Sequence, residues 1–84
     1  MPSRQELEQY WWKRVEEAKH QLQLARQHTR EVENDLQSMP SVDGRFAHRQ
    51  AIRLENQALR KYGSTLRVFI DLLLGGKIPE EPSS

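Results

Sequence analysis

Between Ser3 and Leu36 the chain contains neither proline nor glycine, and glutamate, lysine, arginine, glutamine, leucine and alanine predominate. These are good helix formers, whereas proline and glycine are the residues that most strongly interrupt a helix. The stretch opens with Ser3-Arg4-Gln5-Glu6, which matches the S-x-x-E capping box found at helix starts. The sequence therefore predicts one helix over about residues 4–37, roughly 50 Å long at 1.5 Å per residue.

Residues 38–44 are predicted to form a turn, because Pro40 cannot continue a helix. Asp43 is the expected N-cap of a second helix, since its short carboxylate can accept a backbone N–H of the first turn. This second helix is predicted over about residues 45–74.

The second helix contains one internal glycine, Gly63, and we expect it to continue there with a bend allowed. Gly75-Gly76 then supplies the residue type expected at a helix C-terminus. Residues 77–84 contain two prolines and two glutamates, which predicts a flexible acidic tail.

Apolar and small residues recur at spacings of four and three in both segments, and from Trp11 onward those of the first segment form the heptad pattern of a coiled-coil seam. In the first segment they are Leu7, Trp11, Val15, Ala18, Leu22, Ala25, Thr29, Val32 and Leu36. In the second they are Ala47, Ala51, Leu54, Ala58, Tyr62, Leu66, Phe69 and Leu73. Folding the chain at the turn pairs the two sets in order, from Leu36 with Ala47 to Trp11 with Leu73. We therefore predict an all-α fold, a long antiparallel two-helix hairpin over residues 1–76.

The composition favours association of this hairpin with a second copy. Of the 84 residues, 30% are charged and 36% hydrophobic, so little apolar surface is available for an internal core. The chain has no cysteine, which excludes disulfides as a source of stability. We expect a homodimer, arranged as a four-helix bundle.

The predicted contact surface combines the open end of the hairpin with a flank of the second helix, Ile52, Leu59, Leu66 and Ile70, because these apolar residues exceed what one partner helix can cover. Large contiguous apolar patches usually mark interaction surfaces. The candidate residues for self-association, or for binding another protein, are Tyr10, Trp11, Trp12, Ile52, Leu59, Leu66, Val68, Phe69, Ile70, Leu72 and Leu73.

A second candidate surface is basic. Residues 45–67 carry six basic side chains and one acidic side chain, Glu55. Five arginines fall on one side of the helical wheel, opposite the seam, and we call them the arginine stripe: Arg45, Arg49, Arg53, Arg60 and Arg67. Guanidinium groups suit phosphates and carboxylates, so nucleic acid or an acidic partner is the alternative prediction. The near-neutral net charge of +1 argues against a general affinity for polyanions.

No pattern in the sequence predicts catalysis, a cofactor or a metal site. Glycine-rich phosphate loops and nucleophile motifs are absent. Glu17 and His20 have the spacing of a carboxylate-bridged di-iron motif, but they lie away from the predicted seam. No apolar run reaches the length of a membrane span and the N-terminus is polar, so we expect a cytoplasmic protein that does not use a membrane.

Overall fold

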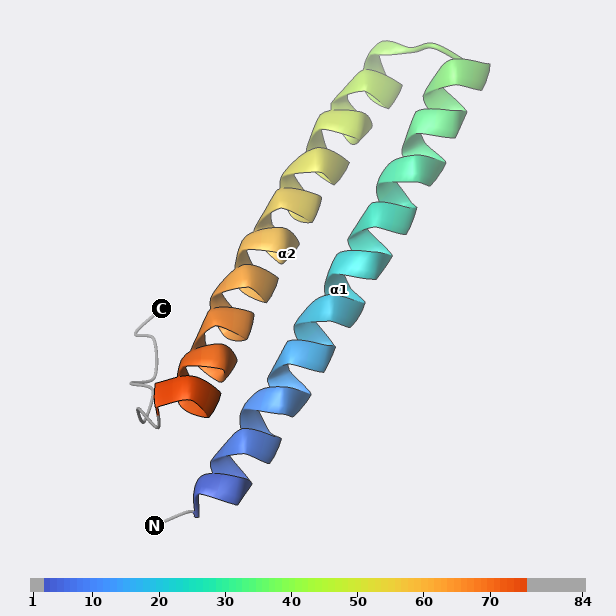
Figure 1. The fold of residues 1–84 in the computed structure, drawn as a ribbon. Helices are drawn as coiled ribbons and strands as arrows, with labels where there is room; N and C mark the ends of the chain where they lie inside the picture. The colour runs from blue at the N-terminus through green and yellow to red at the C-terminus, as the bar shows by residue number, and fades with distance from the viewer. Residues whose placement is uncertain (1–2, 76–84) are drawn as a thin grey trace.

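The computed structural model describes residues 3–75. It contains two long helices, α1 (Arg4–Ser38) and α2 (Val42–Gly75), which lie side by side and run in opposite directions (Figure 1). The hairpin is a rod measuring 55 × 20 × 19 Å. The prediction of an all-α antiparallel hairpin is confirmed. The predicted tail, residues 77–84, lies outside the described residues.

Both ends of α1 are set by local hydrogen bonds. The Ser3 hydroxyl accepts the backbone N–H of Glu6 at 3.2 Å, which satisfies one of the unpaired donors of the first turn. At the other end, the Met39 N–H donates to the carbonyl oxygen of Asp35 at 2.9 Å. Pro40 follows directly and cannot extend the helix.

The start of α2 differs from the prediction. Ser41, rather than Asp43, occupies the N-cap position: its hydroxyl accepts the Gly44 N–H at 2.9 Å, and its carbonyl oxygen accepts the Arg45 N–H at 3.1 Å. The helix therefore begins at Val42 and not near residue 45. Serine and aspartate are similarly good N-caps, so the sequence offered two candidates and the shorter turn formed.

The buried face of α1 follows the predicted seam. Its fully buried residues are Trp11, Val15, Ala18, Leu22 and Thr29, and Leu7, Ala25, Val32 and Leu36 are half-buried. Because these positions alternate in spacing between four and three from Trp11 onward, α1 presents one continuous stripe to α2.

The buried face of α2 overlaps the predicted seam at Ala51, Ala58, Tyr62 and Phe69, which are buried or half-buried. The predicted seam residues Ala47, Leu54 and Leu73 are exposed. The positions that turn toward α1 are Gly44, His48, Ala51, Glu55, Ala58, Tyr62, Thr65, Phe69 and Leu72, all buried or half-buried.

Polar side chains are part of this α2 seam, and His48, Glu55 and Thr65 each have a hydrogen-bonding or ionic partner. His48 contacts a carboxylate oxygen of Glu33 at 3.0 Å, and Glu55 faces Arg26 across a 3.9 Å ion pair. The Thr65 hydroxyl donates to the carbonyl oxygen of Lys61 at 2.7 Å. A hydrophobic pattern cannot show such positions, which explains why the predicted seam missed them.

The pairing of the two helices is consequently shifted by about one helical turn. Leu36 meets Gly44 instead of Ala47. The Thr29 hydroxyl lies 3.4 Å from the carbonyl oxygen of Ala51, whereas the prediction paired Thr29 with Leu54. The earlier start of α2 at Val42 accounts for this shift: with fewer residues in the turn, each residue of α2 lies opposite an α1 residue about three positions farther from the turn.

Candidate interaction surface

The three aromatic residues near the start of α1 point in different directions. Trp11 is only 3% exposed and lies in the hairpin core. Tyr10 and Trp12 are about half exposed and border two different grooves, one on each flank of the hairpin. Because residues two apart on a helix are separated by about 200°, these two side chains cannot form one patch. In the hairpin Tyr10, Trp11 and Trp12 therefore do not share one exposed surface, and their contact with a partner stays a prediction.

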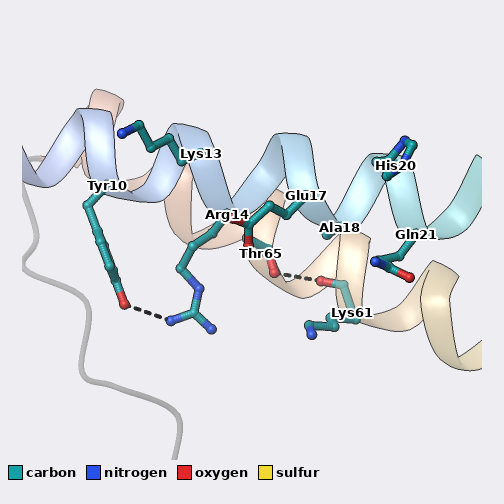
Figure 2. A pocket seen from close by; sticks show the side chains of 9 residues that line it. All are labelled: Tyr10, Lys13, Arg14, Glu17, Ala18, His20, Gln21, Lys61 and Thr65. Atoms are coloured by element: carbon teal, nitrogen blue, oxygen red, sulfur yellow. Dashed lines mark hydrogen bonds between the residues drawn. The ribbon is translucent and has the colours of Figure 1, made fainter.

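The Tyr10 flank is polar and basic. The Arg14 side chain donates to the Tyr10 hydroxyl at 2.9 Å, and its guanidinium carbon lies 4.9 Å from the Trp11 ring centroid. An open groove of about 540 Å³ runs between these residues and Lys61 of α2. Figure 2 shows Tyr10, Arg14 and Lys61 on one side of the helices, with Lys13 and His20 pointing the other way. The Arg14 guanidinium therefore lies over the Trp11 ring and covers one edge of the hairpin core.

The Trp12 flank is more apolar. The Trp12 and Phe69 rings are 5.5 Å apart between centroids, at an interplanar angle of 44°. A groove of about 350 Å³ continues along this flank, where Val15, Tyr62 and Leu66 contribute to its lining. Trp12 and Phe69 therefore join α1 to α2 on the flank that carries the apolar residues of α2.

Along this flank, α2 carries a row of apolar side chains that we call the outer apolar stripe: Ile52, Leu59, Leu66, Ile70 and Leu73. Four of them are exposed and Leu66 is half-buried. Ile52, Leu59, Leu66 and Leu73 recur every seven residues, so they form a straight line along the helix.

Other predicted contact residues belong to the hairpin itself. Leu72 is buried against α1, as Trp11 is against α2, so neither lies on the outer surface. Val68 and Phe69 are half-buried. The predicted surface is therefore reduced to the outer apolar stripe, with Trp12 at its edge.

The prediction missed a second group of exposed apolar residues, at the turn. Met39, Val42 and Phe46 are all mostly exposed, with Val42 reaching 83%. An open groove of about 430 Å³ lies beside them, where Leu36, Met39 and Ala47 are among the lining residues. The apolar residues on either side of Pro40 were the signal in the sequence for this group, but the pattern of residues 38–44 predicts only a turn.

The five arginines of the arginine stripe are all exposed. Among residues 3–75, none of them has a carboxylate oxygen within 4.0 Å. Glu55, the acidic residue of this segment, points toward α1 and pairs with Arg26. The outer surface of α2 from residue 45 to 67 is therefore basic without local neutralisation. Arg53 and Arg60 also border a shallow groove of about 180 Å³.

Acidic and histidine side chains, which could bind metal or transfer protons, are scattered over the described part of the chain. Glu17 and His20 are exposed on α1, and no group of three or more acidic or histidine side chains within residues 3–75 could hold a metal ion. In the same residues, neither helix has a long enough apolar stretch to cross a bilayer.

Comparison with protein-family models, with curated proteins and with solved structures gave no match. The functional argument therefore depends on the surfaces described above.

Proposed function

We propose that this chain is a non-catalytic interaction module that self-associates through the outer apolar stripe of α2. The observation that carries the proposal is the outer apolar stripe, in which the exposed Ile52, Leu59 and Leu73 follow a seven-residue repeat with the half-buried Leu66. A seven-residue repeat is the pattern by which one long helix packs against another. A helix exposing such a row is suited to a helical partner.

The distribution of apolar residues supports the same proposal. Among residues 3–75, six hydrophobic residues are buried, whereas twelve large ones are exposed. A two-helix unit with this balance resembles half of a helical bundle, because its remaining apolar surface needs cover. Dimerisation into a four-helix bundle would supply it. The polar composition and the lack of cysteine fit a cytoplasmic module, which remains a prediction.

Sedimentation equilibrium over a wide concentration range tests the proposal, with circular dichroism on the same samples. Leu59→Lys is the decisive variant, and Leu54→Lys is its matched control: the two leucines are 48% and 52% exposed on different sides of α2. We expect the wild-type chain to dimerise, and Leu59→Lys to raise the dissociation constant at least tenfold. The control should stay close to the wild type. A helical monomer at all concentrations would refute self-association.

A second function, binding of nucleic acid through the arginine stripe, is favoured by the five exposed arginines without carboxylate neighbours. Arg53, Arg60 and Arg67 recur every seven residues, so they stand roughly 10 Å apart along one line. Guanidinium groups in such a line can contact successive phosphates without reading bases. Arg53, Arg60 and Arg67 lie about 100° around the helix from Ile52, Leu59 and Leu66, so these three arginines stay accessible when the outer apolar stripe is covered.

A further inference from the structure

The two faces of α2 follow the same repeat, offset by one residue. The face against α1 runs Gly44, His48, Ala51, Glu55, Ala58, Tyr62, Thr65, Phe69 and Leu72. Adding one to each number gives Arg45, Arg49, Ile52, Asn56, Leu59, Gly63, Leu66, Ile70 and Leu73, which we call the second seam. It contains the whole outer apolar stripe and lies about 100° around the helix from the first. α2 is therefore patterned to pack against two helices at once.

Gly63 is the unexplained member of the second seam. It lies inside a continuous helix, where glycine is among the poorest helix formers. A Cβ atom at this position would meet nothing within 4 Å, so the hairpin itself has no steric need for glycine. At Gly44, by contrast, the same atom would approach Leu36 to 3.0 Å. A bare helix surface at Gly63 instead leaves room for a side chain from outside the hairpin.

A second copy of the chain supplies such a side chain when the two α2 helices run antiparallel. With a twofold axis level with Lys61, Leu59 faces Gly63 of the partner subunit, because both are two residues from the axis. Ile52 faces Ile70 of the partner subunit in the same register, nine residues from the axis. The symmetry repeats each contact, so the centre of the interface holds two leucine-into-glycine contacts.

The charges of α2 favour the antiparallel direction. In a parallel pair, Arg45 and Arg49 would lie beside their own copies and repel them. In the antiparallel register, Arg49 lies opposite Leu73 of the partner subunit, in the last turns of its α2. That helix end carries the negative pole of the helix dipole, and the last turn of α2 has no basic residue of its own.

We propose that Gly63 is the central contact of an antiparallel α2–α2 interface, where it receives Leu59 of the partner subunit. This inference rests on the proposed self-association and adds its direction, register and central residue. Any side chain larger than hydrogen at residue 63 would hold the two helices apart.

Sedimentation equilibrium of Gly63→Leu tests the central contact, with Ser64→Leu as the matched control. Residue 64 is exposed but lies outside the second seam, so the control places the same leucine side chain on a different side of the helix. We expect Gly63→Leu to raise the dissociation constant at least tenfold and Ser64→Leu to change it less than threefold. A wild-type dimer that tolerates Gly63→Leu would overturn this inference and leave self-association standing. A wild-type monomer would refute self-association itself.

Disulfide mapping tests direction and register without relying on the folding of Gly63→Leu. The chain has no cysteine, so introduced thiols have no native competitors. Under mild oxidation, an equimolar mixture of Ile52→Cys and Ile70→Cys chains should form a covalent heterodimer. Ile52→Cys alone should not cross-link, because its two copies would lie roughly 27 Å apart along the axis. Efficient cross-linking of Ile52→Cys alone would overturn the antiparallel register.

Discussion

The Cδ1 atom of Leu36 lies 3.0 Å from the position that a Cβ atom would occupy at Gly44. This contact joins the last turns of α1 to the first turn of α2, where the chain reverses. The hydroxyl oxygen of Ser41, the N-cap of α2, lies 3.0 Å from the same position. Glycine at residue 44 therefore allows the short turn that sets the register of the whole hairpin.

Replacing Gly44 and Gly63 by alanine should have opposite effects on stability. Gly63→Ala should raise the free energy of unfolding by up to about 1 kcal/mol, because alanine is the better helix former. Gly44→Ala should lower it by about 1 kcal/mol, since crowding of Leu36 and Ser41 outweighs the gain in propensity. Urea unfolding followed by circular dichroism measures both, at concentrations where the chain is monomeric. Equal stabilisation by the two variants would contradict the close contact at Gly44.

Ser41→Ala should destabilise the hairpin by about 1 kcal/mol, because the Gly44 N–H loses its acceptor at the start of α2. Asp43→Ala is the informative comparison, since aspartate was the N-cap predicted from sequence. Asp43→Ala should lower the stability less than Ser41→Ala does, because the Asp43 side chain contributes only a favourable charge in the first turn. Thermal unfolding of both variants distinguishes the two N-caps, and a larger effect of Asp43→Ala would argue for the longer turn.

Adjacent tryptophans should respond differently to truncation. Trp11→Ala should cost about 3–5 kcal/mol, because a buried indole leaves a cavity between the helices. That is a large fraction of the stability of a chain this small, so helix content itself should fall. Trp12→Ala should leave the hairpin helical, since Trp12 is 48% exposed. It should weaken self-association by about 1–3 kcal/mol, because Trp12 borders the outer apolar stripe.

Circular dichroism and sedimentation equilibrium on the two tryptophan variants check both outcomes. Loss of helix content in Trp12→Ala with unchanged association would show that this indole stabilises the hairpin rather than an interface.

Binding of nucleic acid through the arginine stripe should depend steeply on salt. The logarithm of the affinity should fall linearly with the logarithm of salt concentration, with a slope near −0.9 for each phosphate contact on duplex DNA. Arg53→Glu/Arg60→Glu should abolish binding in a gel-shift assay. The matched control, Lys19→Glu/Arg30→Glu on α1, changes the net charge by the same amount and should retain most of the nucleic-acid binding. Absent or salt-independent binding by the wild-type chain would remove this function.

The sequence by itself determined the fold and the packing face of α1. From Ser3 to Leu36 helix propensity, the capping box and the heptad repeat agree, so one long helix with a single apolar stripe was the outcome. Pro40 required a reversal, and two long helices joined by a short turn can bury their stripes only against each other. The outer apolar stripe and the arginine stripe were also visible, because residues at seven-residue spacing share a helix side in any register.

Only the tertiary structure decided which residues complete the face of α2 that meets α1. Hydrophobicity favoured Leu54 over Glu55, and it could not distinguish Leu73 from Leu72, which is the buried one. The turn settled the choice, because Ser41 capped α2 early and Gly44 fitted beneath Leu36. Glu55 and His48 could then turn inward, since Arg26 and Glu33 were in reach as partners. Such pairs form only between residues of different helices, so the pattern of residues within one helix does not predict them.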